Sequence, residues 1–141
     1  MEVIKHYLYT KEHEWINLDE NTATIGITDY AQSALGDITY VELPKVDFEV
    51  EQFEQLASVE SVKAASDIFS PMSGKVIEVN TELEGDPGII NRSCYENGWI
   101  AKIQISDIEE KSNLMSAAEY KEFLEDLEVE DKDEDKDKNK E

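Results

Sequence analysis

Lys63 is the residue in this sequence whose type and surroundings best fit a chemical role. It lies in the run Glu60-Ser61-Val62-Lys63-Ala64-Ala65-Ser66, between two segments with the pattern of β-strands. Its neighbours are small, so little crowds the amine. An exposed amine of this kind suits covalent acylation by a second protein, which must close around the side chain. The alternative interpretation is an ordinary solubilising turn lysine, because lysine is almost never fully buried.

The other reactive side chains favour structural interpretations. His6 and His13 are seven positions apart, with no second pair of ligand-type residues at metal spacing, so we expect no metal site. Cys94 is the only cysteine, which excludes an intramolecular disulfide, and we expect a partly buried thiol rather than a nucleophile. The sequence has no Ser/His/Asp set, phosphate-binding loop or dinucleotide fingerprint. We therefore do not expect an enzyme.

Short strands separated by frequent turns are the elements that must position Lys63. Alternating apolar and polar residues predict strands or β-rich segments over residues 7–9, 14–18, 22–27, 37–43, 46–80 and 98–105. Thr28 and Gly36 have the residue types of an N-cap and a C′ position, and they enclose a predicted short helix. The predicted fold class is mainly β, a sandwich or flattened barrel.

The C-terminal region changes from strand to helix periodicity. Ser116 and Glu119 have capping-box spacing before a helical apolar stripe, and Ser106 and Glu109 have the same spacing. Residues 128–141 contain eight Asp or Glu and four Lys and have almost no apolar side chains. We expect them to form an acidic disordered tail, because they cannot bury enough surface to offset the loss of chain entropy. Residues 1–127 then form the single domain.

The charge of the chain limits its partners. The 141 residues carry a formal net charge of −21, of which the tail contributes −4. This charge disfavours nucleic acid and anionic membranes and favours proteins with basic docking surfaces. No apolar run approaches the ~18 residues of a membrane span, and the N-terminus lacks the pattern of a signal or transit peptide. We expect a cytoplasmic protein, or a mitochondrial matrix protein whose presequence is missing.

The order of several segments is more specific than any of these features, and it resembles the H protein family of the glycine cleavage system over almost all of residues 5–127. The matching segments are Tyr9 to Trp15, Ile25 to Gln32, Leu35 to Asp37, Tyr40 to Pro44, Glu60 to Asp67, Pro71 to Val76, Glu78 to Asn80 and Gly98-Trp99. The resemblance implies a flattened lipoyl/biotinyl-type β-barrel with a short helix near 28–35 and a C-terminal helix.

The resemblance also implies a function. The family's lipoyl-lysine maps onto Lys63, which would carry lipoate through an amide on an arm of roughly 14 Å. Such a carrier shuttles an aminomethyl group from the glycine decarboxylase (P protein) to the aminomethyltransferase (T protein), and its dithiol to dihydrolipoyl dehydrogenase (L protein). A lipoylating enzyme attaches the cofactor, and Glu60 is a candidate contact for it, with a solvated strand carboxylate as the alternative interpretation. In the family the loaded arm folds back into a cleft, and Glu14 matches a cleft residue. We expect a monomer.

Some positions depart from the family pattern. Asp47, Phe53 and Ala57 stand where the family usually has glycine, which would allow positive φ in turns. Ala34 falls where some members have histidine, so any contact of that histidine with the arm is lost here. The segment Glu60 to Asp67 is intact, so these departures bear on partner recognition more than on lipoylation.

Three other functions compete with the carrier in glycine cleavage. A related H-like protein could relay lipoate to other lipoyl-dependent enzymes without aminomethyl chemistry. An acidic adaptor could keep the fold and have lost the cofactor. Biotinylation is a weaker alternative, because biotin acceptors usually flank the lysine with methionines, whereas Val62 and Ala64 do so here.

Overall fold

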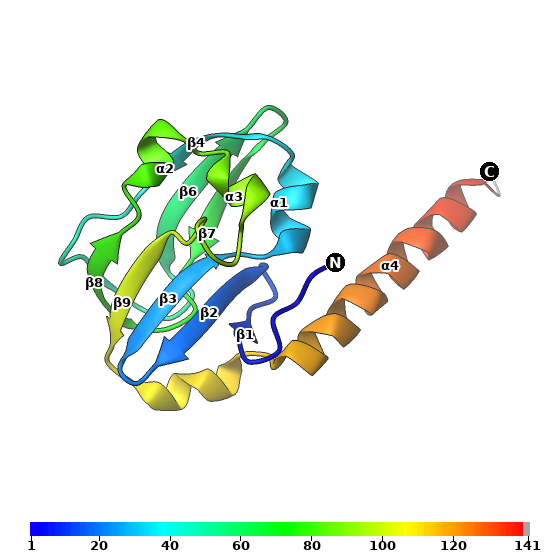
Figure 1. Cartoon of the computed structure of the whole chain (residues 1–141). Helices are drawn as coiled ribbons and strands as arrows, with labels where there is room; N and C mark the ends of the chain where they lie inside the picture. Colours follow the sequence, from blue (N-terminus) through cyan, green and yellow to red (C-terminus); the bar gives the residue numbers. More distant parts are fainter. Residues whose placement is uncertain (140–141) are drawn as a thin grey trace.

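Two antiparallel sheets form the body of the protein (Figure 1). The computed structural model describes the backbone of residues 1–139 and the side chains of residues 1–128. The six-stranded sheet has the order β1 (Leu8–Tyr9), β2 (Glu14–Asp19), β3 (Thr22–Ile27), β9 (Ala101–Ile105), β8 (Gly74–Val79) and β5 (Glu49–Val50). The three-stranded sheet has the order β4 (Ile38–Glu42), β6 (Gln55–Ser61) and β7 (Ala65–Phe69). This arrangement confirms the predicted mainly β fold.

Short helices lie at connections between strands and after the last strand. They are α1 (Asp29–Leu35), α2 (Glu82–Gly85), α3 (Ile89–Arg92) and the 3-10 helix η1 (Ile108–Asn113), and a longer helix α4 (Ala117–Asn139) ends the chain. Among the described residues no helix is both long enough and apolar enough to cross a membrane. The predicted caps of α1 are confirmed: the Thr28 hydroxyl accepts a hydrogen bond from Ala31 N, and Gly36 ends the helix with φ +78°.

The core lies between the two sheets. Strand alternation places apolar side chains such as Ile25, Ile103, Val59 and Ile68 inside, where they are almost completely buried. Trp15 is also buried, and its indole N–H donates to the Cys94 carbonyl at 3.0 Å. The buried apolar side chains form one contiguous cluster, which fixes the two sheets relative to each other.

The C-terminal helix begins as predicted and continues beyond the predicted boundary. Ser116 and Glu119 form the reciprocal bonds of a capping box, with Ser116 N to Glu119 Oε1 at 3.1 Å and Glu119 N to Ser116 Oγ at 3.2 Å. Tyr120 and Leu124 are buried against the body. The segment from 128 to 139, predicted to be disordered, continues α4 in the structure, and residues 140 and 141 lie outside the described residues.

The composition of the tail explains its helical form. It contains no Gly or Pro, and glutamates precede lysines by four positions at 128/132 and 134/138, a spacing that favours helix. Figure 1 shows the C-terminal half of α4 projecting away from both sheets. The sequence of this part therefore favours a helix through local propensity.

The second predicted capping box, at Ser106 and Glu109, is wrong. Asp107 caps this segment instead, and its Oδ1 accepts a hydrogen bond from Glu109 N at 3.1 Å. The segment that follows is the 3-10 helix η1 rather than an α-helix. An Asp next to the Ser offers the same kind of acceptor, so spacing alone could not identify the cap.

The turns that lack the family's glycines keep a left-handed backbone. Asp47 has φ +76° and Phe53 has φ +66°. Ala57 is different: it is buried in β6, opposite Ile68. The turns at 47 and 53 therefore have the conformation that glycine would adopt without strain, and Phe53 keeps it with a bulky side chain that is 51% exposed.

We predict that Phe53→Gly is more stable than Phe53→Ala. Both variants remove the ring, but only glycine relieves the left-handed strain, so the difference should be about 1 kcal/mol in the free energy of unfolding. Urea denaturation measures it. The same pair of substitutions at Glu54, whose φ is not positive, should give the opposite order. Equal stability of the two Phe53 variants would contradict the backbone conformation described here.

Candidate functional site

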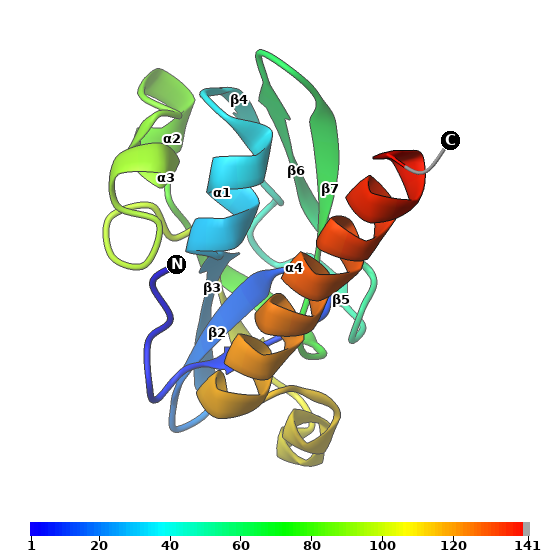
Figure 2. The ribbon, with the colours of Figure 1, turned by 90° about the vertical axis from the view of Figure 1, so that its right-hand side faces the viewer.

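Lys63 lies at the tip of the β6–β7 hairpin. Glu60 pairs with Ala65, and the chain reverses through the residues between them. Figures 1 and 2 show this tip projecting beyond the body, beside α1. The side chains of Val62 and Lys63 are both exposed, with Val62 at 71%. The structure therefore places the lysine where another protein can close around it.

The side chain of Ser61 closes the turn. Its hydroxyl oxygen accepts hydrogen bonds from Lys63 N at 3.2 Å and from Ala64 N at 3.1 Å, while Ser61 N donates to Ala64 O at 2.7 Å. This arrangement explains why the turn needs no Gly, Asn or Asp, since a serine hydroxyl replaces the backbone acceptor. Sequence reasoning did not single out Ser61, although a serine two residues before an exposed turn residue was an available signal.

Gly36 and Asp37 form the corner between α1 and β4, and this corner supports the hairpin tip. Asp37 O accepts a hydrogen bond from Val62 N at 3.2 Å. The Lys63 side chain passes over Gly36, because a Cβ at that glycine would lie 3.5 Å from Lys63 Cε and 4.0 Å from Nζ. Gly36 therefore has two roles, ending α1 at positive φ and leaving room for the lysine stem.

Among the residues whose side chains are described, the amine of Lys63 forms no ion pair. None of the three ion pairs among the described residues involves it. Three exposed carboxylates lie on the outer face of the three-stranded sheet, and none of them takes part in these ion pairs. They are Glu42, Glu60 and Asp67. The surroundings of Lys63 are therefore negative and accessible, and its amine is available for an acyl group.

Glu14 is buried at the other end of β7. Its side chain is 2% exposed. Its Oε2 accepts a hydrogen bond from Phe69 N at 3.2 Å, and its Oε1 is hydrogen-bonded to the Thr10 hydroxyl. Burial raises the pKa of Glu14 to about 7, although both hydrogen bonds act in the opposite direction. The carboxyl thus connects β2 to the strand that leads from Lys63.

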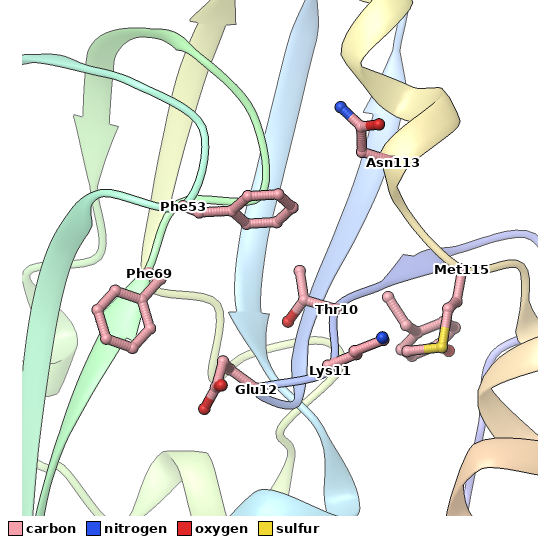
Figure 3. A pocket seen from close by; sticks show the side chains of 8 residues that line it. Thr10, Lys11, Glu12, Phe53, Phe69, Asn113 and Met115 are labelled. Atoms are coloured by element: carbon pink, nitrogen blue, oxygen red, sulfur yellow. The ribbon is translucent and has the colours of Figure 1, made fainter.

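A cavity of about 480 Å³ is lined by both hydrogen-bond partners of this carboxyl, Thr10 and Phe69. The turn before β2 contributes Thr10, Lys11 and Glu12, while Phe53 and Phe69 form an aromatic side and Asn113 and Met115 lie opposite (Figure 3). Its lining combines apolar rings with a few polar groups, which is typical of a site for a small apolar group with a polar end. It lies about 13 Å from the start of β7, since Ala65 and Phe69 are four strand residues apart.

The histidines and the cysteine have structural surroundings. His13 Nδ1 lies 2.8 Å from the Tyr120 hydroxyl, which lies 2.8 Å from the Thr28 hydroxyl, so this histidine joins α4 to α1. His6 is exposed, and no group of three or more metal-ligating side chains occurs among the described residues. Cys94 is buried, and burial raises the pKa of its thiol to about 12, so it is not a nucleophile at neutral pH.

Comparisons with known proteins agree on one family. The family model described as "Glycine cleavage H-protein" matches residues 7–127. The chain is 53% identical over 125 residues to the glycine cleavage system H protein of Coprothermobacter proteolyticus, covering 88% of this chain and 98% of that protein. It is 52% identical over 124 residues to "Glycine cleavage system H protein 2, mitochondrial" of Arabidopsis thaliana, covering 88% and 80%.

A solved structure gives the same result. The crystal structure of a glycine cleavage system H protein from Mycobacterium marinum superposes with a TM-score of 0.78. The two chains are 36% identical, and the match covers 84% of this chain and 95% of that one. The fold class predicted from the sequence, a flattened lipoyl-type barrel, is therefore confirmed.

We predict that the Glu14 carboxyl makes stability depend on pH. Its pKa is about 7 in the folded protein and near 4.5 unfolded, so the folded state holds a proton that the unfolded state releases. This contribution is complete below pH 4.5 and is lost as the pH rises through 7, a loss of roughly 3 kcal/mol. Urea denaturation at several pH values should show this loss in the wild type and not in Glu14→Gln.

Glu60→Gln is the matched control for this measurement, because that carboxyl is exposed. It should leave the pH dependence of the free energy of unfolding as in the wild type. A Glu14→Gln variant with the wild-type pH dependence would contradict the proposed protonation of Glu14.

Proposed function

The chain belongs to the glycine cleavage H-protein family, and we propose that Lys63 is the residue to which the lipoyl group of this protein is attached. The protein is a lipoylated carrier of the glycine cleavage system and not an enzyme. The family match favours this role over the lipoate relay considered from the sequence.

The observation that carries the proposal is the form of the hairpin tip. The Ser61 hydroxyl holds the backbone of Lys63, Gly36 leaves space beside its stem, and its amine makes no ion pair among the described residues. These residues fit a cofactor attached through an amide, since acylation removes the positive charge and here breaks no ion pair. Because the backbone at Lys63 is fixed while its side chain is exposed, the lipoylating enzyme has one backbone conformation to recognise.

When attached, the lipoyl group supplies a disulfide that takes up electrons and a one-carbon group and gives both up again. The chain's own residues position and shelter it. We propose that the cavity lined by Phe53, Phe69 and Met115 receives the end of the arm, because the cavity lies where β7 ends. An arm of roughly 14 Å covers most of the six residues, about 20 Å of strand, that separate Lys63 from Phe69. Glu14 closes the inner side of this region and keeps the turn at Thr10 next to β7.

The partners proposed are the three enzymes of the system and a lipoylating enzyme. The family works with the enzymes of glycine cleavage. The decarboxylase, the aminomethyltransferase and dihydrolipoyl dehydrogenase would each reach Lys63 over the outer face of the three-stranded sheet. That face carries Glu42, Glu60 and Asp67, so it favours partners with basic surfaces around their active-site entrances. Glu60 remains a candidate contact for the lipoylating enzyme.

Three further features belong to the proposal. The carrier unit is residues 1–127, since the family match ends at residue 127 and Tyr120 and Leu124 of α4 are part of the core. It acts as a monomer. Its compartment is the bacterial-type cytoplasm or the mitochondrial matrix, and relatives of both bacterial and mitochondrial origin exist.

We predict that Lys63→Arg abolishes carrier activity. Arginine keeps the charge but cannot form the lipoyl amide, so glycine-dependent ammonia release with the three enzymes and tetrahydrofolate should fall below about 1% of the wild-type rate. Lys75→Arg is the control, since Lys75 is also exposed but lies in β8, and it should retain at least half of the rate. Activity of the Lys63→Arg protein would contradict the attachment site. A lipoylated wild type without activity would favour the lipoate relay.

A further inference from the structure

We propose that Asn91 is a positioning residue for Lys63, acting through the corner that joins α1 to β4. The inference rests on the proposed function, because Lys63 must be the attachment site for its position to matter. Asn91 lies in α3, far from Lys63 in the sequence. Its amide holds both sides of the corner on which the hairpin tip rests.

Asn91 uses both ends of its amide at this corner. Its Nδ2 donates to the Gly36 carbonyl at 2.8 Å and to Gln32 Oε1 at 3.1 Å. Its Oδ1 accepts from Ile38 N at 2.9 Å. One side chain thus satisfies backbone groups on either side of Asp37, in the way that a neighbouring strand would.

The corner needs an external partner because its backbone leaves regular structure. Gly36 ends α1 at φ +78° and ψ −155°, so its carbonyl does not continue the helical pattern. Ile38 is almost completely buried, and its N–H points to Asn91. Without the Asn91 amide, the buried Ile38 N–H would lose its acceptor. An unsatisfied buried donor is costly, so we expect the backbone of the corner to move until this N–H finds another partner.

A movement of the corner would reach Lys63 by two contacts. Asp37 O holds Val62 N, directly before the lysine. Gly36 lies under the lysine stem, with the Cβ position 3.5 Å from Lys63 Cε. The Ser61 hydroxyl closes the turn from inside the hairpin, whereas the corner orients the turn relative to the body.

Asn80 provides a matched control. It is also an asparagine that joins loop segments, since its Nδ2 donates to Asn97 O and to Trp99 O, each at 2.8 Å. It is 4% exposed, and neither of these bonds involves the corner or the hairpin. A variant at Asn80 therefore loses comparable hydrogen bonds without a route to Lys63.

The test compares Asn91→Ala with Asn80→Ala in two measurements at a temperature where both are folded. The first is the rate of lipoylation of the unmodified protein by a lipoate ligase with lipoate and ATP. Asn91→Ala should lower kcat/KM about tenfold, mainly through KM, and Asn80→Ala should stay within twofold of the wild type. The second is the rate at which trypsin cleaves the folded, unmodified protein after Lys63, which should rise about tenfold for Asn91→Ala only.

Asn91→Asp is the second variant and covers the case in which Asn91→Ala does not fold. Aspartate keeps an acceptor for the buried Ile38 N–H but turns a carboxylate toward the Gly36 carbonyl. It should therefore lower kcat/KM for lipoylation and raise the rate of trypsin cleavage, as Asn91→Ala does. Equal effects of the Asn91 and Asn80 variants on both rates would overturn the proposal. A wild type that is not lipoylated at Lys63 would overturn the proposed function instead, and the trypsin measurement would still decide the role of Asn91.

Discussion

The proposed attachment of lipoate to Lys63 requires a side chain that stands clear of its own protein on a backbone that stays fixed, and the hairpin tip provides both. The tip of the β6–β7 hairpin is short, and the Ser61 hydroxyl bonds the amides of Lys63 and Ala64. A side chain that closes the turn from within leaves the outer side of the tip without covering structure. The Lys63 side chain is therefore exposed because nothing covers the outer side of the turn, and its amine has no ion pair among the described residues.

The same hairpin is held at its other end by a buried carboxyl. Glu14 accepts a hydrogen bond from Phe69 N, where β7 ends. Burying an acid is unfavourable for its charged form, and the raised pKa of Glu14 is the result. An apolar residue would avoid this cost but would leave the Phe69 amide without this acceptor. The buried carboxyl instead fixes two residues that line the cavity, because Thr10 and Phe69 are its hydrogen-bond partners.

Local signals in the sequence predicted much of this structure. The caps of α1 at Thr28 and Gly36, and the capping box at Ser116 and Glu119, depend on neighbouring residues and are present. The box at Ser106 was wrong because the adjacent Asp107 provides the cap. The role of Asn91 at Gly36 and Ile38 was not predictable, because it joins residues more than 50 positions apart. Only the resemblance to a family distinguished Lys63 from an ordinary turn lysine, since exposure is common to both.

The most direct test of the account is the mass of one tryptic peptide from protein made in cells supplied with lipoate. Trypsin cleaves after unmodified lysine, so a lipoylated Lys63 leaves residues 46–75 as one peptide. We expect this peptide to carry the mass of one lipoyl group, with fragmentation assigning the group to Lys63. Cleavage after Lys63 in all of the protein, or a lipoyl group on another lysine, would contradict it.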